Sequence, residues 1–183
     1  MGVSCFPPEP PLITGEGFLL RGITVDDTSD MFATLSDAET VKWWMWGDPI
    51  TTRDAAAEFV SNIPILWENG DVFTLAVESE GRFSGIVQFA TLPHRETPSM
   101  STGYVMAPWA RGYGLAVRSL RAAIRWVFTE TGTVTLVGAV IVGNDSSRRV
   151  ARAVGFNHTN DTSLSINGSD VPVWTGTLWR GVY

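Results

Sequence analysis

A glycine-containing turn in the second half of the chain has the residue types of an anion-binding site. Arg111-Gly112-Tyr113-Gly114-Leu115-Ala116 stands between an expected strand that ends at Met106 and a helical pattern that continues to Phe128. Glycines let backbone amides approach a ligand closely, and a helix start adds unpaired N–H groups and the positive end of the helix dipole. Phosphate groups commonly occupy such turns. Because glycines also join strands to helices for steric reasons alone, the turn by itself does not identify a ligand.

Two familiar phosphate motifs do not fit this turn. A P-loop requires Gly-Lys followed by Ser or Thr, and the turn contains no lysine. A dinucleotide fingerprint requires a third glycine three residues after the second, where this chain has Val117, and it lies near the start of its domain. The turn therefore predicts a phosphate site of another kind.

A second motif runs from Asn144 to Phe156, directly after the apolar stretch 134–142. Asn, Asp and Ser at its start are good helix caps, and Gly155 near its end is a good helix stop. These residues predict a short, well-capped helix whatever the function is. Capping alone does not explain why this segment follows the glycine turn in this order.

Taken together, the two motifs resemble those of the GCN5-related N-acetyltransferase (GNAT) superfamily, specifically its RimJ/RimL-like branch. The resemblance covers roughly residues 17–179. The first family motif, R/Q-x-x-G-x-G/A, is matched by residues 111–116. The second, N-x-x-S-x-R-V followed by Gly-Phe, is matched by Asn144, Ser147, Arg149, Val150, Gly155 and Phe156.

The resemblance implies direct transfer of an acetyl group, or another acyl group, from acyl-coenzyme A to an amine, without a metal. It places the strand before the turn beside the pantetheine and the thioester carbonyl, and the amides of the turn around the pyrophosphate. It also implies that the Arg111 side chain, with Arg118 or Arg149, faces a phosphate. The residues that it assigns to the cofactor are Val105, Met106, Arg111, Gly112, Tyr113, Gly114, Leu115, Ala116, Asn144 and Arg149.

The catalytic residues that the resemblance implies are Ser147 and Asn144. Many family members protonate the leaving thiolate with a tyrosine seven residues after the Asn, but this chain has Ala151 there. Ser147 is then either the proton donor or a helix serine with a local hydrogen bond, and Asn144 holds the cofactor or a water. The glutamate that many relatives place before the Gly-Tyr pair is absent, so the general base stays open among Glu78, His94, Glu96 and Asp170.

Three tryptophans within four residues, Trp43, Trp44 and Trp46, fall where the family connects its first two helices and lines the acceptor site. As substrate-binding residues they would form an aromatic wall that also attracts ammonium groups. Tryptophans equally serve core packing or a subunit contact, and one of the neighbours Trp43 and Trp44 is expected in the core.

The charge is unevenly distributed along the chain. The net charge is −6, and it divides into −10 over residues 1–100 and +4 over residues 101–183. This division suits a protein that binds a polyanion on one side and a cationic partner on the other, although most of these charges belong to ordinary surface. The overall acidity argues against a nucleic-acid partner.

The remaining composition favours a cytoplasmic, globular protein of one domain. No apolar run approaches the roughly 20 residues of a membrane helix, so no membrane partner is expected. The single cysteine excludes an internal disulfide and a cysteine zinc site. Residues 1–14 are rich in proline and are expected to form a flexible arm, followed by one domain over residues 15–183. A homodimer is possible, since the apolar C-terminal strands could pair.

The expected fold is α/β (α+β), with a mixed, mostly antiparallel sheet of about seven strands flanked by four helices, as in the GNAT fold. The expected function is an acetyl-CoA-dependent N-acetyltransferase that acts on the primary amine of a small molecule. Two alternatives stay open. One is an N-terminal protein or peptide acetyltransferase, and the other is a non-catalytic acyl-CoA-binding protein of the same fold.

Overall fold

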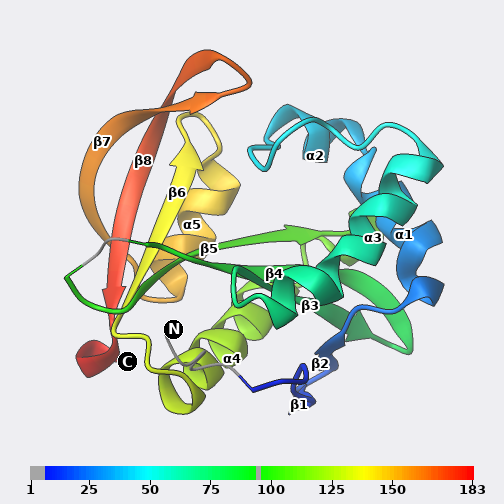
Figure 1. The fold of residues 1–183 in the computed structure, drawn as a ribbon. Coiled ribbons are helices and arrows are strands. Elements are labelled where there is room, and N and C mark those ends of the chain that lie inside the picture. The colour runs from blue at the N-terminus through cyan, green and yellow to red at the C-terminus, as the bar shows by residue number, and fades with distance from the viewer. Residues whose placement is uncertain (1–6, 94–95) are drawn as a thin grey trace.

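The computed structural model describes residues 7–93 and 96–183. These residues form a sheet of eight strands in the order β1-β2-β3-β4-β5-β6-β8-β7 (Figure 1). The β5–β6 pair is parallel and the other neighbouring strands are antiparallel. The strands are β1 (Ile13–Gly15), β2 (Phe18–Gly22), β3 (Val72–Ser79), β4 (Arg82–Thr91), β5 (Ser99–Met106), β6 (Thr135–Ile141), β7 (Asn157–Ile166) and β8 (Ser169–Trp179).

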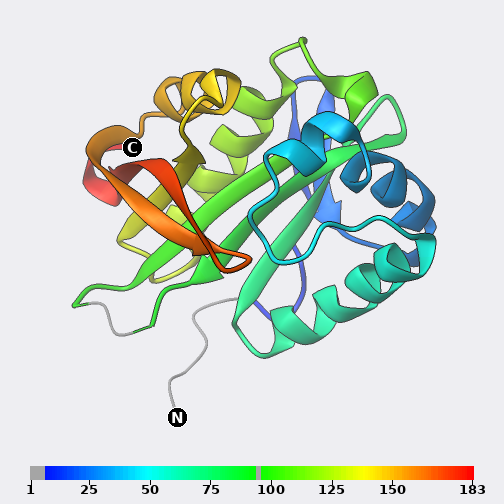
Figure 2. The same cartoon turned by 90° about the horizontal axis from the view of Figure 1, so that it is seen from above.

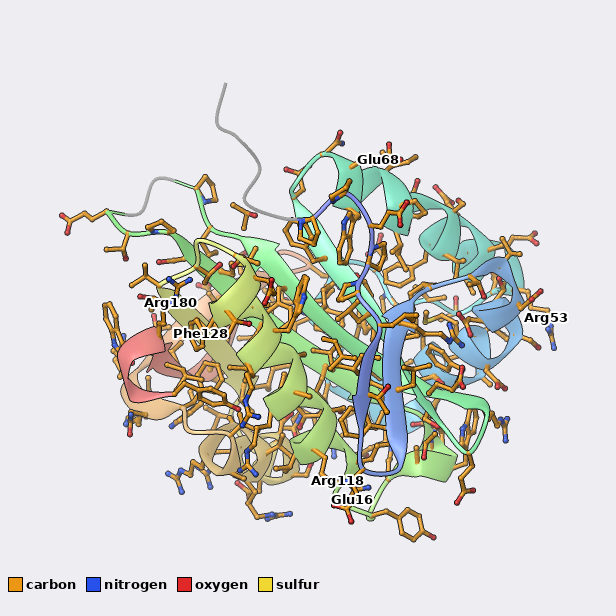
Figure 3. All side chains as sticks on the ribbon, turned by 90° about the horizontal axis from the view of Figure 1, so that it is seen from below. Glu16, Arg53, Glu68, Arg118, Phe128 and Arg180 are labelled. Carbon is orange, nitrogen blue, oxygen red and sulfur yellow. The ribbon has the colours of Figure 1, made fainter. Side chains whose placement is uncertain are left out.

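Helices cover both faces of the sheet and give the molecule three layers. Helix α4 crosses one face, and α1, α2 and α3 lie over the other, as Figures 1 and 3 show from two directions. The helices bury their apolar faces in two cores, one centred on α4 and one centred on α1 and α3. Trp67 of α3 belongs to the first core. The α-helices are α1 (Thr28–Leu35), α2 (Ala38–Lys42), α3 (Arg53–Glu68), α4 (Leu115–Glu130) and α5 (Asp145–Ala153).

The predicted fold class is confirmed, while the predicted count is one strand and one helix short. Strand β1 pairs with β2 through a turn at Gly17, whose φ is +73°, so the sheet begins inside the range predicted as an arm. Helix α2 was not predicted, because five residues are too few to show the 3.6-residue repeat of apolar side chains that marks a helix. Pro64 lies inside α3 without ending it, since the flanking Ile63 and Trp67 are buried in the packed interior.

The parallel strands β5 and β6 separate after a short common stretch, and this separation positions the site. Their pairing runs only from Ser99 with Thr135 to Thr102 with Gly138. Beyond it, β5 continues alongside β4 alone and β6 alongside β8 alone. A gap therefore opens in the sheet at the carboxyl ends of the two strands, beside the first turns of α4 and α5.

Candidate functional site

A cavity of about 970 Å³ occupies the gap between β5 and β6. It is bordered by the glycine turn before α4, the first turns of α5, the segment after α2 and the β7–β8 hairpin. Because side chains alternate between the faces of a strand, the even-numbered Tyr104 and Met106 project toward α4, while Gly103 and Val105 face the α1–α3 side. The cavity thus has one half on each face of the sheet, joined through the gap.

The glycine turn forms the wall of the first half, and its geometry suits an anion. Gly112 and Gly114 have φ values of +87° and +71°, which side-chain-bearing residues rarely adopt. The first backbone bond of α4 runs from Arg118 N to Gly114 O, so the amides that precede it have no acceptor within the helix. Arg118 also donates from Nη1 to Tyr113 O at 2.9 Å, which places a guanidinium beside the turn. These donors fit the pyrophosphate of coenzyme A.

Met106 presents its backbone to the cavity, whereas Val105 does not. In the antiparallel pair β4–β5, Ala107 N donates to Ser84 O at 3.0 Å, and Val105 lies opposite Ile86 two positions further along. Residues of such a ladder point their N–H and C=O alternately to the two sides. Val105 therefore directs its backbone groups toward β4, and Met106 directs them into the gap, where a thioester or pantetheine amide would lie.

The Arg111 side chain has protein partners. Its Nη2 lies 2.8 Å from Asp37 Oδ2 and donates to Thr40 Oγ1 at 2.9 Å, and its Nε donates to Met106 O at 3.1 Å. The expected contact between this guanidinium and a phosphate would have to compete with these three acceptors. The structure instead gives Arg111 a connection to α2, while its backbone begins the turn.

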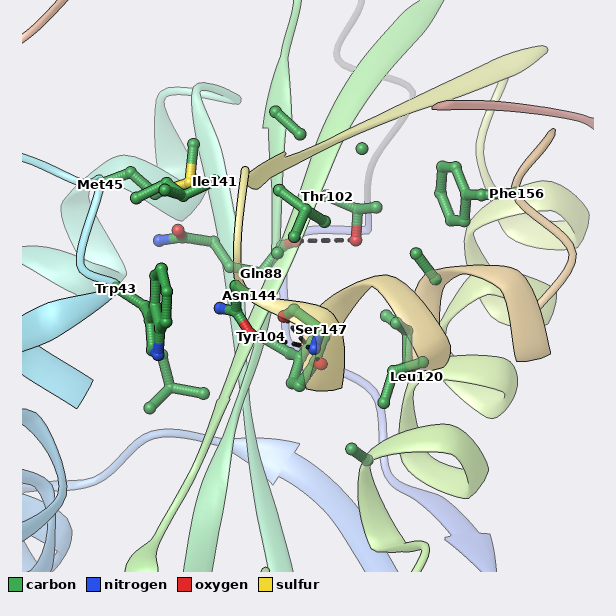
Figure 4. A pocket seen from close by; sticks show the side chains of 18 of the residues that line it. Trp43, Met45, Gln88, Thr102, Tyr104, Leu120, Ile141, Asn144, Ser147 and Phe156 are labelled. Carbon is green, nitrogen blue, oxygen red and sulfur yellow. Dashed lines mark hydrogen bonds between the residues drawn. The ribbon is translucent and has the colours of Figure 1, made fainter. Parts of the chain in front are cut away.

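Asn144 and Ser147 meet at the start of α5, as the second motif predicts. Asn144 caps the helix, with Oδ1 accepting from Ser147 N at 3.1 Å and from Ser146 Oγ at 2.9 Å. Both Asn144 and Ser147 line the cavity. Since Oδ1 is engaged, Nδ2 of Asn144 is the group left to bind a ligand, and Figure 4 shows this side chain between Trp43 and Ser147.

Tyr104 is the functional candidate that sequence reasoning missed. Its Oη reaches from β5 to α5, where it lies 3.0 Å from Ser147 Oγ (Figure 4). Burial raises the pKa of the Tyr104 phenol above its ordinary value and outweighs the opposing effect of the Ser147 hydrogen bond, so the hydroxyl is protonated at neutral pH. The family pattern places the tyrosine on the helix after Asn144, so the strand was not considered. The alternation of side chains along β5 would have placed Tyr104 on the face of the sheet that α4 and α5 cover.

The second half of the cavity carries the three tryptophans. Trp44 is buried among α1 and α3 residues, as expected for one member of the Trp43–Trp44 pair. Trp43 is half-buried and approaches the Cα of Gly143, and the ring of Trp46 packs on the Cα of Gly103, in the space that a Cβ would fill. All three line the cavity, together with Met45 and Gln88. The geometry gives this half an aromatic, largely neutral wall.

Of the described residues, one carboxylate lines the cavity, and it is not among the predicted bases. Glu39 accepts a hydrogen bond from Trp43 Nε1 at 2.7 Å. Glu78 pairs with Arg21 at 2.7 Å, and neither it nor Glu96 or Asp170 reaches the cavity wall. His94 lies outside the described residues.

Two of the residues that the resemblance assigns to the cofactor lie outside the cavity wall. Arg149 is exposed on α5 and does not line the cavity, and the Tyr113 side chain points into solvent at 76% exposure.

The β7–β8 hairpin tip reaches the tryptophan segment, where Asn167 Nδ2 contacts Gly47 O at 3.4 Å; Figure 2 shows the two segments side by side. Within residues 7–93 and 96–183, no cluster of His, Cys, Asp and Glu is arranged to hold a metal. No described helix is long and apolar enough to span a membrane.

A glycine turn, a parallel strand pair that separates and a capped helix meet at one cavity, which is the arrangement expected of an acyltransferase of the GNAT fold. The chain belongs to the GNAT acetyltransferases, because residues 18–157 match the model of that family, described as "Acetyltransferase (GNAT) domain". No protein of curated function gives a significant sequence match.

Solved structures of RimJ, RimL and other acetyltransferases share the fold of this chain. The α-N-protein acetyltransferase RimL in complex with coenzyme A superposes with a TM-score of 0.81 at 18% identity, over 92% of this chain and 98% of RimL. Mycobacterium smegmatis RimJ gives 0.80 at 18% identity, over 90% and 83%. The microcin self-immunity acetyltransferase MccE, in complex with acetyl-CoA and AMP, gives 0.81 at 16% identity, over 97% and 99%.

Proposed function

We propose that this protein transfers an acetyl group from acetyl-CoA directly to the primary amine of a small molecule. The supporting observation is the cavity that passes through the sheet, with an anion turn in one half and an aromatic, largely neutral wall in the other. The pyrophosphate would lie on the amides of residues 112–116, and the thioester would lie in the gap beside Met106. An amine held by Trp43 and Trp46 then meets the thioester carbonyl at the gap.

In this proposal, the chain's own residues stabilise the developing charges. The N–H of Met106 polarises the thioester carbonyl as an oxyanion donor. Ser147 Oγ donates a proton to the leaving sulfur, and Tyr104 Oη replaces it, since the two hydroxyls lie 3.0 Å apart. Tyr104 in turn takes a proton from solvent. The carbon–nitrogen bond forms as the carbon–sulfur bond breaks, the sulfur takes the electron pair and one proton, and the amine nitrogen gives up one proton to solvent.

A small acceptor is favoured by the contact between Asn167 and Gly47, which brings the hairpin and the tryptophan segment together over the acceptor half. A second candidate acceptor is the α-amine of a protein or peptide, because RimL is described as an α-N-protein acetyltransferase. A peptide would have to pass between these two segments. Asn167→Ala should therefore raise the turnover of a peptide acceptor if the second candidate is correct.

The proposal is tested by thermal unfolding and thiol release. Acetyl-CoA at about 100 times its Kd should raise the Tm by several degrees, since it binds only the folded state. A panel of primary amines should then contain at least one that releases free coenzyme A thiol above a baseline set by the single Cys5. Stabilisation without release for any amine or peptide would favour a non-catalytic acyl-CoA-binding protein. Absence of both responses would refute the proposal.

The acceptor, rather than the enzyme, should set the pH dependence of the reaction. The one described carboxylate in the cavity wall is already bonded to Trp43, so the amine must lose its proton to solvent. The kcat/KM should rise with pH through the acceptor's own pKa, roughly 7.7–8.0 for an α-amine and roughly 10.4 for an alkyl amine. Profiles between pH 6 and 11 for two such acceptors should differ by about 2.5 units in apparent pKa. An identical apparent pKa for both would point to a base on the enzyme.

A further inference from the structure

The ion pair between Arg111 and Asp37 joins the two halves of the cavity. Arg111 begins the glycine turn, and Asp37 is the N-cap of α2, which leads directly into the tryptophan segment 43–46. The guanidinium and the carboxylate lie 2.8 Å apart and both are mostly buried, with 34% and 24% of their side-chain surfaces exposed. The same guanidinium also donates to Thr40 Oγ1 of α2 at 2.9 Å, so Arg111 links the turn to this helix twice.

Three protein acceptors bind the guanidinium. Besides Asp37, it bonds Thr40 Oγ1 within α2 and the carbonyl of Met106 at the end of β5. Asp37 also accepts from Thr40 N at 3.1 Å, which caps the helix. Desolvation raises the pKa of the Asp37 carboxyl, but the hydrogen bonds from Arg111 and Thr40 outweigh it and hold the pKa below its ordinary range. The carboxylate is therefore charged, and the pair persists, at neutral pH.

Helix α2 depends on such contacts. A helix of five residues is far shorter than one that is stable alone in water. Its position, and with it the position of Trp43 and Trp46, follows from the groups that hold its ends. The turn at the other end of the pair contains Gly112 and Gly114. Glycine has more backbone freedom to lose than any other residue type when a ligand orders it.

We infer that Arg111 and Asp37 are positioning residues through which coenzyme A on the glycine turn orders the acceptor wall. The inference rests on the proposed function, since it assumes that the turn binds the pyrophosphate. Binding fixes the backbone of residues 111–116, the guanidinium is fixed with it, and α2 and the tryptophan segment lose freedom. An acceptor then meets a formed aromatic wall, and by linkage it strengthens coenzyme A binding by the same factor.

The test is amide hydrogen exchange with and without coenzyme A, read separately over residues 111–118 and 38–50. In the wild type, coenzyme A should slow exchange in both segments. Asp37→Asn should retain slowing in 111–118 and lose it in 38–50, because Asn keeps the N-cap but not the charge. Asp37→Glu, which keeps the charge, should restore part of the effect.

Asp30 provides the matched control. Asp30 lies on α1, and its carboxylate pairs with Arg82 of β4 at 2.8 Å. Neither residue lines the cavity. Asp30→Asn should respond to coenzyme A as the wild type does. Slowing of 111–118 without 38–50 in the wild type, or an unchanged response of 38–50 in Asp37→Asn, would overturn the coupling alone. Absence of slowing in 111–118 would instead overturn the cofactor site of the proposed function.

Discussion

Replacing Gly114 with glutamate is expected to abolish binding of coenzyme A, with a loss of at least about 100-fold in affinity. The φ of +71° at Gly114 costs roughly 1–2 kcal/mol for a residue with a Cβ. The larger cost comes from the new carboxylate, which would stand at the helix start where the proposal places the pyrophosphate. The backbone strain lowers the stability of the folded variant, and repulsion between the two anions in a partly buried site accounts for the loss of affinity.

The measurement is a calorimetric titration of free coenzyme A into the folded variant. Gly17→Glu is the matched control, because Gly17 also has a positive φ, of +73°, with open space around a Cβ, but lies in the β1–β2 turn away from the cavity. It should lose similar stability and keep wild-type affinity. If Gly114→Glu binds coenzyme A as tightly as Gly17→Glu, the pyrophosphate does not lie on this turn.

The glycine turn and the cap of α5, which form two walls of this site, can be predicted from the sequence because each motif consists of a few consecutive residues. The glycine turn is recognisable from Gly112 and Gly114, and the cap of α5 from Asn144 and Ser147, and the structure places both at one cavity. The order of the elements follows in the same way, from apolar runs separated by turns. Both features depend on backbone requirements that single residue types satisfy.

The contacts between those walls join residues that are far apart in the sequence, so no local motif predicts them. Tyr104 and Ser147 are 43 residues apart, and Arg111 and Thr40 are 71 apart. Each pair depends on how far β5 and β6 diverge and on where α2 lies. The sequence suggests a phosphate role for Arg111 because it stands in the motif. In the structure the half-buried Arg111 guanidinium pairs with the carboxylate of Asp37, a residue 74 positions earlier that no local pattern connects to the turn.

The second large effect is expected from Ser147→Ala, which should lower kcat about 100-fold or more while leaving coenzyme A affinity unchanged. A positioned acid contributes roughly 10²–10⁴ to such a step. Tyr104→Phe should lower kcat less, by about 10-fold, because Ser147 can still exchange its proton with solvent. The double variant should be no slower than Ser147→Ala, since two residues that act as one relay are not additive.

Ser146→Ala separates this role from damage to the helix start. Ser146 is the neighbouring serine, and its Oγ also bonds Asn144, at 2.9 Å, so its removal disturbs the same cap without touching Tyr104. Steady-state kcat, with single-turnover rates to exclude slow product release, should stay close to wild type for Ser146→Ala. Equal losses in the Ser146 and Ser147 variants would reduce Ser147 to a capping residue. A purely additive double variant would remove Tyr104 from the proton path, because the 3.0 Å contact would then serve packing alone.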